Sequence, residues 1–496
     1  MLTRRTLLQT TAAAGTAMAF TGVLPGVRAI AQPIPLRRSL QDMDLDDPIL
    51  GTLREFVTMM KDPSRNGQPV SWLSFSGIHG DFFPIGFNLC PHGNWYFLPW
   101  HRGYIRMYEV AARALTGNND FAMPYWDWTA QPDFPAAFGD PTFDGQPNPL
   151  FVAGRLLETG DQLDESAVGQ AVLDQIYDTI DYEEFGTSRP AGQNSTDPSW
   201  IMATTGIQGT LEATPHNIVH CDVRGPFMCT GASPQDPIFM MHHANIDRIW
   251  AEWIALGRSN STDPLWLDMP FTDNFIDPSG NTYTDVVSQL LEVEPLGYTY
   301  GLVEPKEPPI YYDPGRSLYL AALFGAPEAL AAAAPERLVA RNLGAATPGD
   351  PLSVALEVNP AALQQATAPA AASALEAAGM APRRVYAFIR DMLPTDSENT
   401  QLRVFVNLPD ATENTPTSDP HYVTTIGFFG PTEIPGGHAM HPSVAVNLTP
   451  ALRQIGSTTP LESDQITVQL VPVPRADGAA ASAISVTPGA IELAIV

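Results

Sequence analysis

Apolar residues recur at the spacing of an α-helix in four segments of the first 300 residues. In the first segment they follow this spacing from Leu50 to Met60, between an Asp-Pro pair at each end. Proline suits the first turn of a helix, because its missing N–H would have no partner there. The pattern predicts helices that begin at Pro48, Pro99, Pro215 and Pro237 and end near residues 61, 115, 224 and 256. The chain to about residue 300 is therefore expected to be mainly helical, with long surface loops over residues 131–200.

The pattern changes after residue 301. Residues 303–381 hold a proline cluster and long alanine-rich and proline-rich stretches, which favour a linker, with a small helical subdomain as the alternative. From Arg383 onwards, apolar and polar residues alternate in short runs separated by turn residues. The sequence therefore predicts a mainly α domain over 32–302, a linker over 303–381 and an all-β sandwich over 382–496.

The composition fits a folded chain of more than one domain. The 496 residues are 44% apolar, and a single hydrophobic core rarely serves a chain longer than roughly 300 residues. The formal charge of -28 would repel nucleic acid and anionic membrane surfaces. We therefore expect no nucleic-acid partner, and the sequence leaves the oligomeric state open.

The first 31 residues have the features of an export signal. Arg4-Arg5 is a twin-arginine pair, a weakly apolar stretch follows it, and Ala29-Ile30-Ala31 has the small-x-small pattern of a cleavage site. We expect export by the twin-arginine pathway, to the periplasm or out of the cell, and removal of residues 1–31. No later segment is long and apolar enough to span a bilayer, so the mature chain is not expected to insert into a membrane.

Three cysteines are too few for a disulfide framework. Cys221 and Cys229 either pair with each other or remain two partly buried thiols, and the sequence leaves both possibilities open. Cys90 lies apart from them and two residues before a histidine.

Histidines form the clearest chemical signal in the chain. Seven of the ten lie between residues 79 and 243, in two separate frames. The first frame contains His79, His92 and His101, and the second contains His216, His220, His242 and His243. Calcium and magnesium prefer oxygen ligands, and structural zinc usually recruits thiolates. Two adjacent sites with three imidazoles each therefore favour copper.

The expected helices place several of these histidines relative to one another. His216 and His220 are four residues apart, so they share one helical face and can bind a single ion. His243 and Asp247 repeat that spacing on the last helix, which predicts that His243 faces inward and that Asp247 lies beside the site. His242 is rotated from His243 by roughly 100°, so we expect it beside the site and not among the ligands.

The two frames resemble the copper motifs of the type-3 copper proteins, which are the tyrosinases, catechol oxidases and molluscan-type haemocyanins. Trp100-His101-Arg102 with Glu109 matches the first motif, and the runs 216–220 and 236–243 match the second. The resemblance implies a four-helix bundle around a dicopper centre. By that match, copper A is held by His79, His92 and His101, and copper B by His216, His220 and His243.

The resemblance extends to other parts of the chain. Pro124-Tyr125-Trp126-Asp127-Trp128 matches the family, and the Tyr298 and Tyr300 pair resembles the usual end of the catalytic domain. Residues 461–472 resemble the C-terminal domain of plant polyphenol oxidases. By this likeness, the C-terminal domain is expected to cover the copper site and keep the enzyme latent.

Several single residues around the expected copper ligands also match positions that have a known role in the family. Phe239 resembles the aromatic residue that stacks on a copper B imidazole, and Glu212 with Asn217 resembles the pair that holds a proton-accepting water. Thr230 lies where the family places a gate residue over copper A. Cys90 has the Cys-x-His spacing that in fungal tyrosinases and haemocyanins forms a thioether to the histidine, here His92.

The resemblance implies a secreted polyphenol oxidase that uses two copper ions, with dioxygen as co-substrate, to oxidise phenolic small molecules. Tyrosinase activity, the ortho-hydroxylation of monophenols, is expected in addition to the oxidation of o-diphenols to o-quinones. The alternatives are a catechol oxidase without monophenol hydroxylation, a haemocyanin-like dioxygen carrier, and a dizinc hydrolase. The last is disfavoured because no carboxylate bridges the motif histidines.

Overall fold

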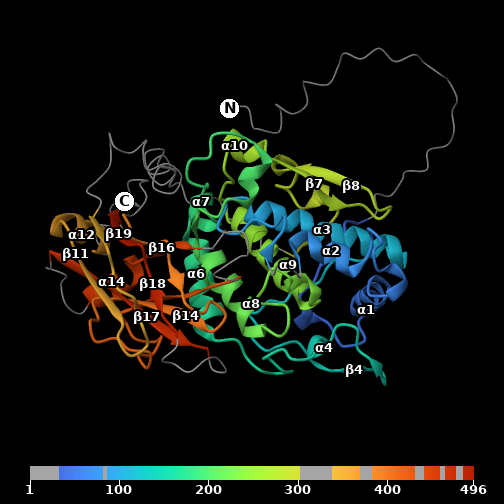
Figure 1. Cartoon of the computed structure of the whole chain (residues 1–496), viewed down its shortest axis with the longest axis horizontal. Helices are drawn as coiled ribbons and strands as arrows, with labels where there is room; N and C mark the ends of the chain where they lie inside the picture. The colour runs from blue at the N-terminus through green and yellow to red at the C-terminus, as the bar shows by residue number, and fades with distance from the viewer. Residues whose placement is uncertain are drawn as a thin grey trace, which may run out of the picture. The chain divides into compact units, whose positions relative to one another are not determined.

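A computed structural model describes residues 33–81, 86–301, 338–368, 383–430, 441–457, 464–475 and 484–496. Within them, the chain has a helical core and a β-rich C-terminal region, drawn in Figure 1 in blue to yellow and in orange to red, respectively. The expected export signal over residues 1–31 lies outside the described residues. No helix in the described ranges is long and apolar enough to cross a membrane.

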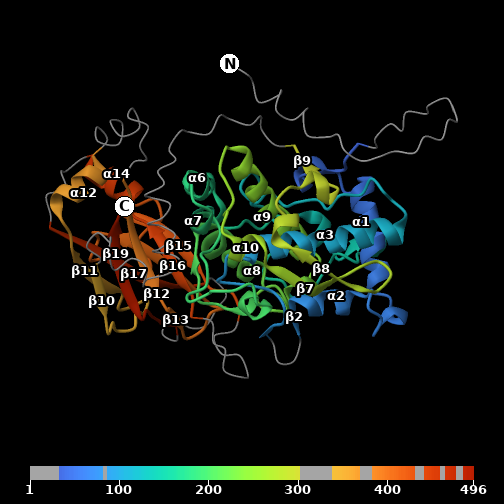
Figure 2. The same cartoon turned by 90° about the horizontal axis from the view of Figure 1, so that it is seen from above.

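Four helices correspond to those that the sequence predicts. They are α1 (Pro48–Met60), α3 (Phe97–Thr116), α8 (Asn217–Val223) and α9 (Ile238–Ala255). The Asp47 side chain caps α1 by accepting from the Ile49 N–H, with Pro48 in the first turn. Gly117 ends α3 in the left-handed conformation, as its position after the last periodic residue predicts. The helices α3 and α9 pack against each other (Figure 2).

Two predicted helix starts are wrong. The helix α3 begins at Phe97, two residues before Pro99, because Pro99 occupies a position in the first turn that needs no N–H donor. The third helix does not begin at Pro215, which lies inside a π-helical turn over Glu212–His216 that leads into α8. In that turn the Asn217 N–H reaches back to the Glu212 carbonyl, so the helical path bypasses the missing donor of Pro215.

The sequence did not predict α2 (Trp72–His79), which is short and has apolar residues on most of its faces. The prediction of long surface loops over 131–200 is also partly wrong. This stretch contains α4 (Ala136–Gly139), α5 (Glu165–Val168), α6 (Gln170–Asp178) and α7 (Tyr182–Phe185). Proline and glycine separate these short helices, which bury residues such as Phe138, Ile176 and Phe185. Because these helices are short and frequently interrupted, the composition of the segment resembles that of a loop.

The described part of the C-terminal region contains two sheets of more than two strands. The five-stranded sheet has the order β10 (Leu338–Arg341), β19 (Ala490–Ile495), β12 (Val385–Arg390), β16 (Ser443–Asn447) and β6 (Ile207–Gln208). The four-stranded sheet has the order β11 (Leu352–Glu357), β17 (Gln465–Pro474), β14 (Thr400–Val406) and β15 (Tyr422–Gly427). Residues of both sheets share one hydrophobic core, to which Val354, Ile389, Val404 and Leu493 belong.

Part of the expected linker is structured. Within 303–381, the described residues include β10, β11 and α12 (Pro360–Thr367), and the two strands pair with β19 and β17. In β11 only Val354 and Leu356 are buried, so its apolar signal is too short to stand out in an alanine-rich and proline-rich segment. The linker prediction is therefore wrong for residues 338–367. The rest of that stretch lies almost entirely outside the described residues.

One strand links the helical part of the chain to the C-terminal sheet. The strand β6 precedes the π-helical turn and pairs in parallel with β16, with Ile207 opposite Ser443 and Gln208 opposite Val444. It therefore completes the edge of a sheet whose other strands come from the last third of the chain.

Shorter elements surround the core. They are α10 (Pro264–Leu267), α14 (Thr449–Gly456), β1 (Leu36–Arg37), β2 (Gly80–Asp81), β3 (Gly86–Phe87), β4 (Thr142–Phe143), β5 (Gln146–Pro147), β7 (Pro270–Ile276), β8 (Thr282–Val286), β9 (Thr299–Tyr300), β13 (Leu393–Pro394) and β18 (Val486–Thr487). β1 pairs in parallel with β9, which brings Arg37 beside Tyr300.

Asp247 connects four separate segments of the helical core. Its carboxylate accepts from Arg37 Nη1 at 3.0 Å and from Arg102 Nε at 2.5 Å. It also accepts from the hydroxyls of Tyr298 at 2.8 Å and Tyr300 at 2.7 Å. Burial alone would raise the pKa of Asp247, but the two guanidinium groups outweigh burial and hold that pKa below its usual value. This residue, expected near the copper site, thus holds β1, α3, α9 and β9 together.

Replacing Asp247 by Asn should destabilise the protein by about 3–5 kcal/mol, because two buried guanidinium groups lose their shared counter-charge. Thermal unfolding of the two proteins measures the difference. Since the folded-state pKa of Asp247 is depressed, its contribution is complete above the unfolded pKa of roughly 3.9 and is lost as the pH falls through the folded value. The difference between the proteins should therefore shrink in acid. Asp46→Asn, at an exposed site, is the control, and an equal loss from both substitutions would contradict this role.

Candidate metal centre

The first cluster joins two helices and the loop between them. His79 is the last residue of α2, Cys90 and His92 lie in the following loop, and His101 is in α3. All four side chains are buried, and one nitrogen or sulfur atom from each lies within 4.8 Å of the others. The sequence frame is thus brought together in space, including His79, for which the sequence showed no surrounding motif.

Backbone carbonyls orient two of these imidazoles. His79 Nδ1 lies 2.7 Å from the Gly231 carbonyl oxygen, and His101 Nδ1 lies 2.7 Å from the Phe97 carbonyl oxygen. A carbonyl oxygen only accepts, so Nδ1 carries the proton in both rings and Nε2 keeps a free lone pair. This is the arrangement of a metal-binding histidine.

The second cluster is built by the π-helical turn, α8 and α9. His216 Nδ1 lies 2.9 Å from Asn217 Oδ1, and His220 Nδ1 lies 2.7 Å from the Met228 carbonyl oxygen. These contacts again leave the Nε2 lone pairs free. The Nε2 atoms of His220 and His243 are 3.1 Å apart, so both rings point to one place.

His242 lies in the same cluster in space, next to the three histidines that the sequence predicts as ligands. Its ring centroid lies 4.8 Å from that of His220, because the side chain is long enough to reach the site from the neighbouring helical position. However, the Trp128 indole N–H donates to His242 Nδ1 at 3.3 Å. Indole is only a donor, so the His242 proton resides on Nε2. His242 Nε2, which is buried and has no hydrogen-bond partner, therefore carries a proton and offers no free lone pair.

The two clusters adjoin each other. The rings of His101 and His243 stack with centroids 4.3 Å apart and planes 13° apart, and the His92 and His216 centroids are 5.6 Å apart. The Phe239 centroid lies 4.2 Å from that of His243 and 5.1 Å from that of His79, so this ring contacts both clusters.

The donor set suits a soft or borderline metal ion. Burial lowers the pKa of His79 and of His216 to about 3, so both imidazoles are neutral at physiological pH and need lose no proton to bind a metal. Their Nε2 atoms are buried and have no hydrogen-bond partner. A buried polar atom without a partner is costly unless something else satisfies it. The two clusters fit a dinuclear copper centre that binds dioxygen.

Cys90 lies among the first cluster as a free, buried thiol. Its Sγ is 3.5 Å from Nδ1 and 3.9 Å from Nε2 of His92, and 3.2 Å from His101 Nε2. Burial raises the pKa of this thiol well above its usual value. The sulfur therefore lies beside the His92 ring as an uncharged thiol.

Glu212 and Asn217 are both buried, and one side chain joins them. Gln208 donates to Glu212 Oε1 at 3.1 Å, and its own carbonyl oxygen accepts from Asn217 Nδ2 at 3.3 Å. Glu212 also accepts from the Gly93 N–H at 2.8 Å and from the Thr187 hydroxyl. Burial raises the pKa of Glu212 to about 7, although these three donors oppose the shift. Gln208 was not predicted from the sequence, where its distance of four residues from Glu212 was the only signal.

Thr230, the expected gate, is half-buried and donates to the Phe227 carbonyl oxygen at 2.8 Å. It is the neighbour of Gly231, whose carbonyl orients His79. Phe429, which follows β15 and which was not predicted from the sequence, contacts several of the imidazole rings. The Phe429 centroid lies 4.2 Å from that of His220 and 5.0 Å from that of His92. Its position between two glycine residues at a strand end was the only hint in the sequence.

The other two cysteines form a disulfide, which settles the alternative that the sequence left open. Cys221 in α8 is bonded to Cys229, and both are buried. The bond lies in an apolar cluster with Phe429.

Comparison with known proteins agrees with this geometry. A family model described as the common central domain of tyrosinase matches residues 69–256, which include every histidine of both clusters. The chain is 30% identical over 298 residues to a tyrosinase of Hahella sp. (strain CCB-MM4), covering 52% of this chain and 61% of that protein. It is also 30% identical over 288 residues to the chloroplastic polyphenol oxidase D of Solanum lycopersicum, covering 52% of this chain and 48% of that one. The matches thus span about half to three fifths of these relatives.

Two solved structures share the fold over nearly the whole chain. A latent apple tyrosinase has a TM-score of 0.62 at 20% identity, with 93% of this chain and 97% of that chain covered. A latent aurone synthase, a polyphenol oxidase, has a TM-score of 0.61 at 21% identity, with coverages of 93% and 89%. Since the paired histidine clusters, the family model and these relatives all agree, residues 69–256 form a central domain of the type-3 copper family of tyrosinases and polyphenol oxidases.

Proposed function

We propose that this protein is a copper-dependent polyphenol oxidase that uses dioxygen to oxidise o-diphenols to o-quinones. The observation that carries the proposal is the pair of adjoining clusters of buried, neutral imidazoles. In four of these rings the Nδ1 proton is held by an oxygen acceptor, so the Nε2 lone pairs face the centre of the site. A dioxygen carrier would need the same ligands, so turnover of a catechol is the decisive property.

The proposed ligands follow from ring orientation. Copper A would be held by His79, His92 and His101, and copper B by His216, His220 and His243. His242 is left out because the Trp128 N–H occupies its Nδ1 and places its proton on Nε2. When bound, two copper ions supply the means to reduce dioxygen to water with the electrons of two catechols. The protein keeps the ligands neutral, oriented and shielded from bulk water.

Monophenol hydroxylation is the finer part of the proposal. A monophenol must lose its hydroxyl proton on binding, and Glu212 offers a buried acceptor whose pKa is about 7. Asn217 and Gln208 hold the neighbouring positions through their amides. A catechol oxidase without this activity is the alternative, and it would leave Glu212 as a support for the Gly93 backbone.

We also propose the helix bundle, the β-sandwich, the thioether and the export route that the sequence predicts. The helices that carry the ligands, α2, α3, α8 and α9, would form the four-helix bundle of the site, and the two C-terminal sheets a β-sandwich. The position of Cys90 Sγ beside the His92 ring supports the expected thioether. Export through the twin-arginine pathway rests on Arg4-Arg5 and on the small residues near position 31.

We also propose that the C-terminal region covers the copper site and keeps the enzyme latent. Phe429 provides the cover, since its ring lies against His92, His216 and His220. Two residues earlier, the Gly427 carbonyl oxygen accepts from Asn217 Nδ2 at 3.0 Å. A side chain at position 427 would collide with the backbone of Ile218, because a Cβ there would lie 2.9 Å from its nitrogen. Glycine thus allows the cover to approach closely.

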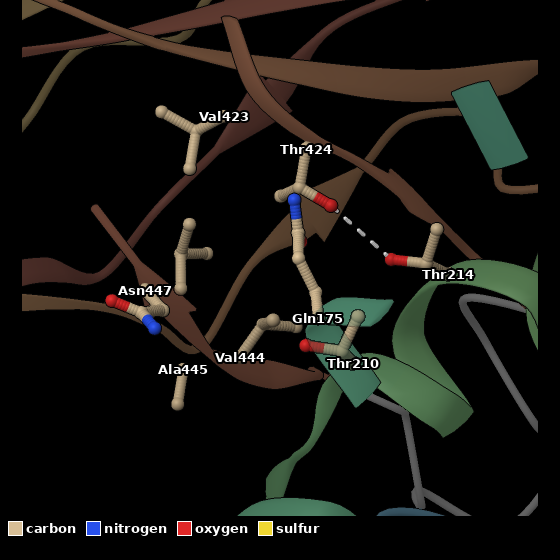
Figure 3. Close-up of a pocket in the computed structure, with 9 residues that line it drawn as sticks. Gln175, Thr210, Thr214, Val423, Thr424, Val444, Ala445 and Asn447 are labelled. Carbon is tan, nitrogen blue, oxygen red and sulfur yellow. Dashed lines mark hydrogen bonds between the residues drawn. The ribbon is translucent and has the colours of Figure 1, made fainter. Parts of the chain in front are cut away.

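The contacts beneath this cover include many polar groups. Thr214 donates to the Thr425 carbonyl oxygen at 2.8 Å and lies 3.4 Å from the Thr424 hydroxyl (Figure 3). A cavity of about 10 Å³ beside them, lined in part by Gln175 and Asn447, has room for about one water molecule. Polar and hydrated contacts are typical of surfaces that separate without unfolding. This supports a cover that can be displaced.

Metal content and turnover test the proposed function. The purified chain should hold two copper ions, absorb in the near ultraviolet after addition of hydrogen peroxide, and oxidise L-DOPA. His243→Ala should remove about one copper and abolish turnover, whereas His242→Ala, at the adjacent position, should retain both ions. Tyrosine as substrate then separates a tyrosinase from a catechol oxidase. Zinc in place of copper, or two copper ions without catechol turnover, would contradict the proposal.

Removal of the Phe429 ring should relieve latency. Phe429→Gly should raise kcat/KM for L-DOPA several-fold at unchanged copper content, because a phenol ring can then reach the imidazoles. Leu393→Gly is the matched control, since it removes an exposed apolar side chain from the same β-rich region. Unchanged kcat/KM, or loss of copper from the Phe429 variant, would show that the ring supports the site instead of blocking it.

A further inference from the structure

We propose that the disulfide between Cys221 and Cys229 positions one histidine in each copper site, so that a single covalent bond tunes both. The inference rests on the proposed function, because it assigns the disulfide a role in copper binding. Cys221 and Cys229 act as positioning residues in it, through the loop that their bond closes.

The link to the second cluster is direct. Cys221 follows His220 in α8, and Cys229 follows Met228, whose carbonyl oxygen lies 2.7 Å from His220 Nδ1. The disulfide and this hydrogen bond therefore connect the same two short segments side by side. The bond fixes the distance between the helix that carries the imidazole and the carbonyl that orients it.

The link to the first cluster continues along the same loop. Two residues after Cys229, the Gly231 carbonyl oxygen lies 2.7 Å from His79 Nδ1. The Thr230 between them is fixed by its N–H and its hydroxyl, which both donate to the Phe227 carbonyl oxygen, at 2.9 and 2.8 Å. Any shift of Cys229 is therefore passed to the acceptor that sets the tautomer and plane of His79.

The loop lacks other regular support. No helix or strand is formed between Arg224 and Ala232, and Arg224 and Gly225 both have positive φ, at 47° and 60°. Local turn hydrogen bonds, such as that from the Met228 N–H to the Arg224 carbonyl oxygen at 2.9 Å, hold the loop without tying it to the helices around it. A hydrogen bond of 2.7 Å from its carbonyls is lost after a displacement of about 1 Å. The disulfide is the covalent restraint on this stretch. Both sulfur atoms are buried, which keeps the bond away from thiols in solution.

Other histidines do not depend on the loop. His101 is oriented by Phe97, one turn earlier in its own helix, and His216 by the adjacent Asn217. Each site would thus keep well-oriented imidazoles and lose the orientation of one when the disulfide is absent. Loss of such an orienting contact typically weakens metal binding by about 10–100-fold. We therefore expect two weakened sites, in contrast to the single empty site that a ligand substitution produces.

The test compares copper release from the full-length protein and from C221S/C229S. Serine removes the bond without leaving thiols that would themselves bind copper. Both copper ions should pass to a chelator about 10–100 times faster from the double variant, and its near-ultraviolet band with hydrogen peroxide should weaken. Pro226→Ala, an exposed change in the same loop that retains the disulfide, should release copper like the unmodified protein.

The outcomes separate this inference from the proposed function. Absence of copper from the unmodified protein would refute the proposed function itself. Two copper ions in both proteins, with equal release rates and a lower unfolding temperature for the variant, would mean that the disulfide serves only the fold. Faster release of one ion alone would also overturn the inference. Should the serine pair not fold, C221A/C229A provides the same comparison with smaller, apolar side chains.

Discussion

The hydrogen bond from an imidazole Nδ1–H to a fixed oxygen is the interaction on which the rest of this site depends. A histidine binds a metal through Nε2 only when its proton is held on the other nitrogen. His79, His101 and His220 use backbone carbonyls for this purpose, and His216 uses the Asn217 amide. Burial adds the second condition by keeping the rings neutral. The same burial makes the arrangement costly without a metal, because the Nε2 atoms of His79 and His216 then have no partner.

Much of this site could be predicted from short-range sequence patterns. The four-residue spacing of His216 and His220 and the spacing of His243 and Asp247 are local properties of a helix, and the structure contains both. Both ends of α1 could also be predicted, because Asp47, Pro48 and Asp62 lie within one turn of the end that each of them marks. In these places the sequence and the local physics suffice.

The parts that could not be predicted depend on contacts between distant residues. The carbonyl that orients His79 lies 152 residues away along the chain, and backbone carbonyls carry no sequence signal. The hydrogen bond that sets the tautomer of His242 comes from Trp128, which lies 114 residues away along the chain. The strands β10 and β11 were hidden because their pairing partners, β19 and β17, come more than a hundred residues later. The composition of residues 338–367 therefore predicted a linker, although these residues form two strands and a helix.

Gln208 contacts both the proposed C-terminal cover and the residues around the proton acceptor. Its backbone pairs with Val444 of the C-terminal sheet, while its side chain joins Glu212 to Asn217. Asn217 in turn donates to Gly427 and accepts from His216. A displacement of the C-terminal region would therefore free one amide hydrogen of Asn217 and remove the strand partner of Gln208 in the same movement. Uncovering the imidazoles and rearranging the groups around the proton acceptor would then be one event, because the same two residues take part in both.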